Sequence, residues 1–385
     1  METLGPAVAM AGLWIPNVRA VVAESGTVIV ANGGAKPIRL GTWVPQQEAG
    51  GVLHVWDWSK SPESRVYKDV ELWAGELITL SPTGQQLVWA NGTILDLQTG
   101  KKTSIDLGPA DIEVKGHTYR RIGNLQFSPD GRRLAVQITN MDEQQPGLIK
   151  SERIRIVEFP GGKVLGEFQP GESYALRIGF SPDGRKIAAG DPARQIALRD
   201  ATTGDALRQF APAMQAQVMG VALSPDGGYV AAYERPDEIS GGVQTGDILI
   251  WSSASGRQVH RLESARLRER GGLTTTYGGL RFSPDGKHLC AETWGRISVI
   301  EVATGEIVAA LKSDMARTIQ WSRDGQTLTT VSPVAGGEGG NGIPEGRYDV
   351  YPSVREFDWR SGVVLRTMTS AAPEVKGAAR AKSEE

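Results

Sequence analysis

The chain has 385 residues, a formal net charge of −2 and a single cysteine. This length suits two ordinary domains or one large closed repeat domain. The near-neutral charge gives no reason to expect nucleic acid or an anionic membrane as a partner, and one cysteine excludes an intrachain disulfide. No segment approaches the roughly 20 consecutive apolar residues of a membrane-spanning helix.

The N-terminal residues, 1–14, are predicted to be a lead segment that precedes the fold. Residues 1–10 contain no Lys or Arg and only a short apolar run, so they lack the features of a secretory signal. The sequence therefore predicts a cytoplasmic protein. A periplasmic location is the alternative if the true N-terminus differs from the one given.

From residue 15 onward the chain repeats one hairpin, seen most clearly at Phe282-Ser283-Pro284-Asp285-Gly286. An apolar strand leads into the turn, and another apolar strand follows it at once. Proline suits the second position of a β-turn, aspartate the third, and glycine the left-handed conformation that follows. With variations, the turn recurs at 23–26, 81–84, 128–131, 181–184, 224–227, 283–286 and 322–325.

A second marker follows each hairpin, a strand that runs into a turn ending in glycine. A last short strand then closes each unit, as at 308–311. Each unit is thus predicted to hold four strands, in seven units. The second marker lies at 95–100, 157–162, 198–204, 250–256, 300–305 and 357–362, and at Trp56-Asp57-Trp58 in the first unit.

These paired turns resemble the repeats of WD40-type β-propellers, including the WD40-like repeats common in bacteria. The resemblance covers about residues 15–370 and implies an all-β fold, a seven-bladed β-propeller of four-stranded antiparallel blades. The chain departs from the best-ordered repeats, because it has the Gly-His pair only at Gly116-His117 and Trp-Asp only at Trp56-Asp57. Such a resemblance predicts the fold rather than the function.

Two ways of closing the ring stay open from sequence. The last blade closes without a shared strand, or residues 11–15 pair with its outer edge. Beyond the propeller, residues 371–385 are charged and rich in alanine with no apolar period, so a disordered tail is predicted.

The units differ mainly between their second and third strands. Insertions are predicted there in units one, three, five and seven, and two links between units are long as well. In propellers of this type all of these connections open on one face, while the opposite face carries only tight turns. The insertions are 33–50, 139–151, 234–246 and 332–352, and the long links are 108–121 and 263–277.

The insertions carry aromatic and aliphatic residues, which are common in protein interfaces. The sequence therefore predicts a non-catalytic protein–protein interaction scaffold, or an accessory subunit of a larger complex, that binds a protein partner through these loops. The competing interpretation is that the same side chains pack back on the propeller rim. The predicted partner-binding residues are Ile38, Trp43, Met141, Leu148, Ile239, Val243, Ile343, Tyr348 and Tyr351.

Motifs of catalysis and metal binding are not found. The four histidines fall in different units without HxH or HExxH spacing, and there is no GxSxG elbow or Walker loop. No catalytic, cofactor-binding or metal-binding residue is therefore predicted, and Cys290 is expected to be a small buried hydrophobe. His117 is expected to form a structural hydrogen bond within its blade.

Two alternatives of other classes stay open. One is a propeller hydrolase or lactonase with its site in the axial funnel, and the other is a periplasmic propeller of the Tol-associated kind. The candidate funnel residues are Asn124, Arg177, Gln217 and Arg317.

Overall fold

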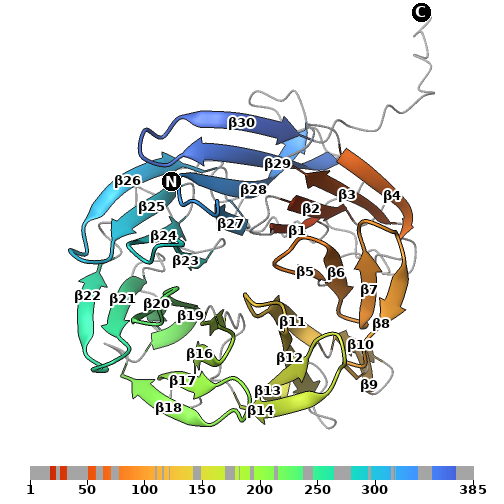
Figure 1. The fold of residues 1–385 in the computed structure, drawn as a ribbon, viewed down its shortest axis with the longest axis horizontal. Coiled ribbons are helices and arrows are strands. Elements are labelled where there is room, and N and C mark those ends of the chain that lie inside the picture. Colours follow the sequence, from red (N-terminus) through yellow and green to blue (C-terminus); the bar gives the residue numbers. More distant parts are fainter. Residues whose placement is uncertain are drawn as a thin grey trace, which may run out of the picture.

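A computed structural model gives the fold as a ring of β-sheets (Figure 1). The structure describes residues 18–22, 27–32, 51–57, 64–70, 78–108, 111–114, 117–120, 122–141, 149–169, 178–181, 183–190, 195–211, 216–236, 246–263, 279–293, 296–313, 316, 318–336 and 349–369.

Each blade of the ring is a four-stranded antiparallel meander, in which every strand pairs with the next along the chain. The first sheets are β1(Val18–Val22)–β2(Thr27–Asn32)–β3(Gly51–Asp57)–β4(Ser64–Val70), β5(Ile78–Leu80)–β6(Gln86–Trp89)–β7(Thr93–Asp96)–β8(Lys102–Ser104), and β11(Ile122–Phe127)–β12(Arg133–Met141)–β13(Ile149–Glu158)–β14(Val164–Phe168). The next are β15(Gly179–Phe180)–β16(Lys186–Gly190)–β17(Ile196–Asp200)–β18(Ala206–Phe210) and β19(Ala216–Leu223)–β20(Tyr229–Pro236)–β21(Asp247–Ser252)–β22(Gln258–Leu262). The last are β23(Leu280–Phe282)–β24(His288–Thr293)–β25(Arg296–Glu301)–β26(Ile307–Lys312) and β27(Thr318–Trp321)–β28(Thr327–Gly336)–β29(Asp349–Asp358)–β30(Val364–Thr369).

The core lies between the sheets rather than within one of them. Alternation along β6 sends Leu87 and Trp89 into a cluster with Leu53 of β3, whereas Val88 joins Leu134 of β12 in the next cluster. Six clusters of this kind lie between successive sheets from β1–β4 to β27–β30. The inner strands of the intervening sheets are therefore buried on both faces, which explains why a strand such as β16 reads as an apolar run, whereas an outer strand such as β18 is mostly exposed.

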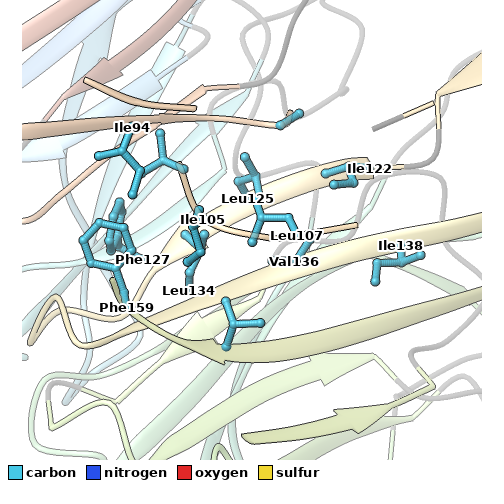
Figure 2. Close-up of a cluster of buried hydrophobic side chains, with 13 residues drawn as sticks. Ile94, Ile105, Leu107, Ile122, Leu125, Phe127, Leu134, Val136, Ile138 and Phe159 are labelled. Atoms are coloured by element: carbon cyan, nitrogen blue, oxygen red, sulfur yellow. The ribbon is translucent and has the colours of Figure 1, made fainter. Parts of the chain in front are cut away.

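Figure 2 shows the cluster between the second and third sheets along the chain. Ile94 and Ile105 come from one sheet, and Phe127 and Leu134 from the other. The rings of Phe127 and Phe159 meet edge-on, with their centroids 4.8 Å apart. Each fully buried side chain of this size contributes about 1.5–3 kcal/mol to folding, so the contact between blades is a main source of stability.

Near the axis the blades approach too closely for large side chains. Ala188, Ala189, Ala231 and Ala232 are fully buried on β16 and β20, as the sequence predicted for the inner strands. A Cβ atom added to Gly179 of β15 would lie 2.9 Å from the backbone nitrogen of Leu223 in the next blade. Small residues are therefore required where the sheets converge.

The prediction of an all-β propeller with four-stranded antiparallel blades is confirmed. Strand pairing and side-chain burial together define six blades, from β5 to β30. The sequence predicts seven. In the β1–β4 sheet the strand pairing is complete, but burial is described only for Val22, Leu53, Val55 and Tyr67.

Two of the predicted insertions contain more strand than the sequence indicated. The segment 332–352 was expected to project as a loop, yet β28 runs to Gly336 and β29 begins at Asp349. These two strands pair through Pro333↔Pro352, beyond the length of a usual blade strand. In the same way, β12 reaches Met141 and β13 begins at Ile149. In each case the two strands that flank the insertion pair with each other, and this pairing lengthens both strands. The residue propensities of one strand alone do not reveal it.

The link at 108–121 is also structured. It contains the two-stranded sheet β9(Asp111–Val114)–β10(His117–Arg120), which is separate from every blade. His117 lies on this hairpin between blades, and its expected structural hydrogen bond within a blade stays a prediction. The prediction for Cys290 is confirmed, because its thiol is fully buried on β24.

Candidate interaction surface

The turns between first and second strands are built by one repeated set of hydrogen bonds. In the turn at 283–286 the Ser283 hydroxyl donates to an Asp285 carboxylate oxygen at 2.6 Å and accepts from the His288 backbone N–H at 2.9 Å. The Gly286 N–H donates to the Ser283 carbonyl at 2.8 Å, and Gly286 has a φ of 71°. Serine, aspartate and glycine are thus each fixed by a separate requirement of the turn.

Turns of this kind from successive blades contact one another. A Cβ atom at Gly131 would lie 3.5 Å from Pro82, and one at Gly184 would lie 2.9 Å from Asp130. The same holds for Gly325, whose Cβ would lie 3.6 Å from Pro284 of the preceding blade. The turns therefore gather at one end of the ring, called here the turn face.

The opposite end, called here the loop face, follows from the meander topology. Strands alternate in direction, so the connection from second to third strand lies at the other end from the turn between first and second. The long connections β2–β3, β12–β13, β20–β21 and β28–β29 all belong to this end. The link that carries the β9–β10 hairpin starts at the same end, because it follows β8, the fourth strand of its sheet.

The predicted partner-binding residues fall mostly outside the described part of the chain. Met141 is the last residue of β12 and pairs with Ile149, and Tyr351 on β29 pairs with Val334. Both lie toward the loop-face ends of their strands, and their contact with a partner stays a prediction. The remaining residues lie outside the described ranges and are Ile38, Trp43, Leu148, Ile239, Val243, Ile343 and Tyr348.

Buried polar groups near the loop face were missed by the sequence reasoning. Glu234 is 3% exposed near the end of β20, and Glu292 is fully buried near the end of β24. Glu152 on β13 accepts a hydrogen bond from the Gln137 amide at 3.1 Å, while its burial raises the pKa of the carboxyl. The sequence feature that could have revealed these buried residues is a glutamate within an otherwise apolar strand, as in Tyr233-Glu234.

The outer strands present another feature of the rim. Apolar residues near the start of these strands are exposed, from Val164 at 50% to Leu365 at 51%. On the last blade three of them are consecutive, Val363, Val364 and Leu365. The second turn at 200–204 packs against the preceding outer strand, because a Cβ atom at Gly204 would lie 3.0 Å from the carbonyl oxygen of Glu167.

Residues considered for chemistry are spread around the ring. The histidines lie on four different elements: His54 on β3, His117 on β10, His260 on β22 and His288 on β24. Within the described ranges, no group of three or more His, Cys, Asp or Glu side chains is placed to hold a metal ion.

The funnel candidates are only partly located. Asn124 lies on β11 and Gln217 on β19, both innermost strands, whereas Arg177 and Arg317 lie outside the described residues. The described residues thus place only the backbones of Asn124 and Gln217, and the axial funnel site stays a prediction. For the part of the chain described here, no helix is long and apolar enough to cross a membrane.

No protein-family model matches the sequence, and no curated protein matches it. The arrangement of the turn face and loop face is therefore the basis for any functional proposal.

Proposed function

We propose that the protein is a non-catalytic interaction scaffold, or an accessory subunit, that binds a protein partner through its loop face. The strongest support is that the two ends of the ring differ in the length and regularity of their connections. The turn face is built from short, uniform turns that contact one another, whereas the long connections, and the link that carries the β9–β10 hairpin, start at the opposite end. Binding loops on a rigid scaffold generally follow this plan.

The proposal includes the finer description of the fold as a seven-bladed, WD40-like propeller. The β1–β4 sheet supplies the further blade, because β1 lies beside β5 on one side and beside β27 on the other. Its Leu53 and Val55 belong to the cluster with Leu87 of the second sheet, and the Tyr67 hydroxyl donates to the Leu97 carbonyl at 2.7 Å. In this arrangement the ring closes between β27 and β1, with the four strands of the last blade all supplied by the C-terminal part of the chain.

A deletion experiment tests the assignment of the face. Residues 237–245 and 337–348 are replaced by short Gly-Ser linkers, which costs little closure entropy. The shortened protein is expected to unfold cooperatively but to lose capture of its partner from an extract of the source cell, identified by cross-linking and mass spectrometry.

The matched control changes the turn face instead. Arg132, Arg185 and Lys287 are exposed at the turns, and their replacement by alanine is expected to leave partner capture intact. Capture that survives deletion of both loops but is lost in the turn-face variant would refute the proposal.

A further inference from the structure

The hairpin between β6 and β7 carries a chemically labile pair, Asn91-Gly92. Asparagine is a labile residue, and it deamidates most readily before glycine, which has no Cβ atom to obstruct the attack of its backbone nitrogen on the asparagine side chain. The same pair occurs in the sequence at 32–33 and 341–342, and the structure describes both residues at 91–92. Asn91 is exposed to solvent, so water and hydroxide reach it.

Deamidation of this pair needs only water and base. The backbone nitrogen of Gly92 loses its proton to hydroxide and forms a bond to Cγ of Asn91. The bond from Cγ to the side-chain nitrogen breaks, and that nitrogen leaves as ammonia after taking a proton from water. Water then opens the resulting succinimide ring at either carbonyl. One product is aspartate, and the other is isoaspartate, in which the main chain runs through Cβ and Cγ and is one carbon longer.

The closed hairpin engages both reacting groups in hydrogen bonds. The Gly92 N–H donates to the Trp89 carbonyl at 2.9 Å. The Thr93 N–H donates to Oδ1 of Asn91 at 2.9 Å. The first bond keeps the proton on the nitrogen that must attack, and the second fixes the amide group that must be attacked. Formation of the succinimide ring therefore requires the hairpin to open.

The main chain of Gly92 is also fixed on the side of the next strand. The Ile105 N–H donates to the Gly92 carbonyl at 2.9 Å, and a Cβ atom at Gly92 would clash with the Ile105 carbonyl oxygen. Ile105 is buried in the cluster of Figure 2, together with Ile94 of β7. Gly92 itself has a φ of 84°, which favours glycine. A main chain lengthened by one carbon before Gly92 cannot keep all of these contacts.

We propose that Asn91 is a site of spontaneous deamidation that the closed β6–β7 hairpin protects, and that isoaspartate formed in the open state prevents the hairpin from closing again. A molecule that has opened is thereby marked permanently. The aspartate product has no such effect, because its carboxylate retains the acceptor for the Thr93 N–H and its main chain is unchanged. This site is independent of the proposed role of the loop face, because the reaction involves no protein partner.

The first test compares the rate of deamidation at Asn91 in native protein, in protein unfolded by urea, and in a synthetic peptide of residues 85–97. Peptide mapping by mass spectrometry at mildly alkaline pH follows each asparagine separately. We expect unfolded protein to react at the rate of the peptide, and native protein to react at least about tenfold more slowly because only the open fraction reacts. Equal rates in native protein and peptide would overturn the protection. Absence of deamidation in the peptide would overturn the site.

Two conservative variants distinguish local opening from global unfolding. Ile105→Val removes one buried methyl group next to Gly92, and Ile300→Val removes one from the cluster between the β19–β22 and β23–β26 sheets. We expect Ile105→Val to raise the native rate of deamidation at Asn91 about threefold. Ile300→Val should leave that rate unchanged. Equal rates in the two variants would overturn the assignment of this hairpin as the protecting element.

A second readout tests the consequence of the modification. Protein partly deamidated in urea is returned to buffer, and isoaspartate at residue 91 is measured in the refolded and in the aggregated fraction. We expect isoaspartate to be depleted at least about threefold in the refolded fraction, whereas Asn91→Asp should refold fully and unfold at the wild-type urea midpoint. Equal amounts of isoaspartate in the two fractions would overturn the proposed block to closing. A strongly destabilised Asn91→Asp would show that the charge, not the longer main chain, is responsible, and would overturn it as well.

Discussion

At the scale of single residues, the turn serines each form more than one hydrogen bond that builds the turn. Ser128, Ser181, Ser224, Ser283 and Ser322 are the first residues of equivalent turns, and in each the hydroxyl donates to the aspartate two residues later. Each hydroxyl also accepts the backbone N–H five residues on, which is the entry to the second strand. A serine therefore joins the turn to the sheet.

Replacement of one such serine should destabilise the fold. Ser283 is 2% exposed, so Ser283→Ala leaves the His288 N–H buried without its acceptor and removes the donor to Asp285. The expected loss is about 1–3 kcal/mol of unfolding free energy, measured by urea denaturation. Ser255→Ala is the control, because Ser255 is an exposed turn residue, and it should change stability by less than about 0.5 kcal/mol. Equal effects of the two substitutions would contradict this account.

The turn aspartates should make stability depend on pH at the acid end. Hydrogen bonds from the serine hydroxyls lower the pKa values of Asp183, Asp226 and Asp324 from the ordinary 3.8. A carboxyl whose pKa is lower in the folded state stabilises the fold above the unfolded pKa, and that contribution is lost as pH falls through the folded pKa. Unfolding midpoints in urea should therefore fall as the pH drops below about 4.

A triple variant isolates this effect from other carboxylates. Replacement of the three aspartates by asparagine should lower stability at pH 7 and flatten the pH dependence between pH 5 and pH 3. An unchanged slope in the triple variant would show that other groups govern acid unfolding.

At the scale of elements, the contacts between neighbouring strands of different blades set the geometry of the ring. Gly166 of β14 packs against the second turn of the next blade so closely that a Cβ atom would lie 2.5 Å from the Thr202 carbonyl oxygen. Near the axis, β15 approaches β19 across Gly179. Glycine is needed at both places because the obstacle is backbone, which cannot move aside as a flexible side chain does.

Two glycines in the same blade test the close approach directly. Gly179→Ala should destabilise the protein by about 1–3 kcal/mol, because the new methyl group meets the backbone of Ala222 and Leu223. Gly190→Ala is the matched control, since its nearest neighbour, Val218 Cβ, lies at an ordinary 3.7 Å. That variant should be neutral or slightly stabilised. Thermal and urea unfolding of the two proteins provide the comparison, and a more harmful Gly190→Ala would refute the close approach.

At the scale of the whole molecule, stability depends on the blades remaining in contact around the ring. The cluster between the last two sheets contains Cys290, Trp321 and Trp359, and the two indole rings meet edge-on with centroids 5.8 Å apart. Opening the ring at this interface exposes the only thiol in the chain. Cys290 is thus a natural reporter of ring opening.

Labelling of Cys290 by a thiol reagent should be slow in the native protein and should follow unfolding. Burial raises the pKa of the thiol to about 12, so the reactive thiolate is scarce while the interface is closed. Trp321→Ala should cost about 3–5 kcal/mol and accelerate labelling at least about a hundredfold when reclosing is faster than modification. Val308→Ala, at a site 46% exposed on β26, should leave the rate unchanged. Rapid labelling of the native protein would show that the blades do not seal this interface.

The amino-acid sequence by itself determined the turns, the four-strand units and the propeller class. A turn such as 283–286 is specified by four consecutive residues whose conformational preferences act locally, and the apolar runs on both sides follow from burial of both sheet faces. Features that depend on partners distant in the sequence were decided only by the tertiary structure. The ladder of β28 and β29 continues past Pro333 because another strand pairs with it, and β9 and β10 form a hairpin inside an expected loop. The close approach of Gly179 to β19 likewise exists only once the strands of different blades stand side by side around one axis.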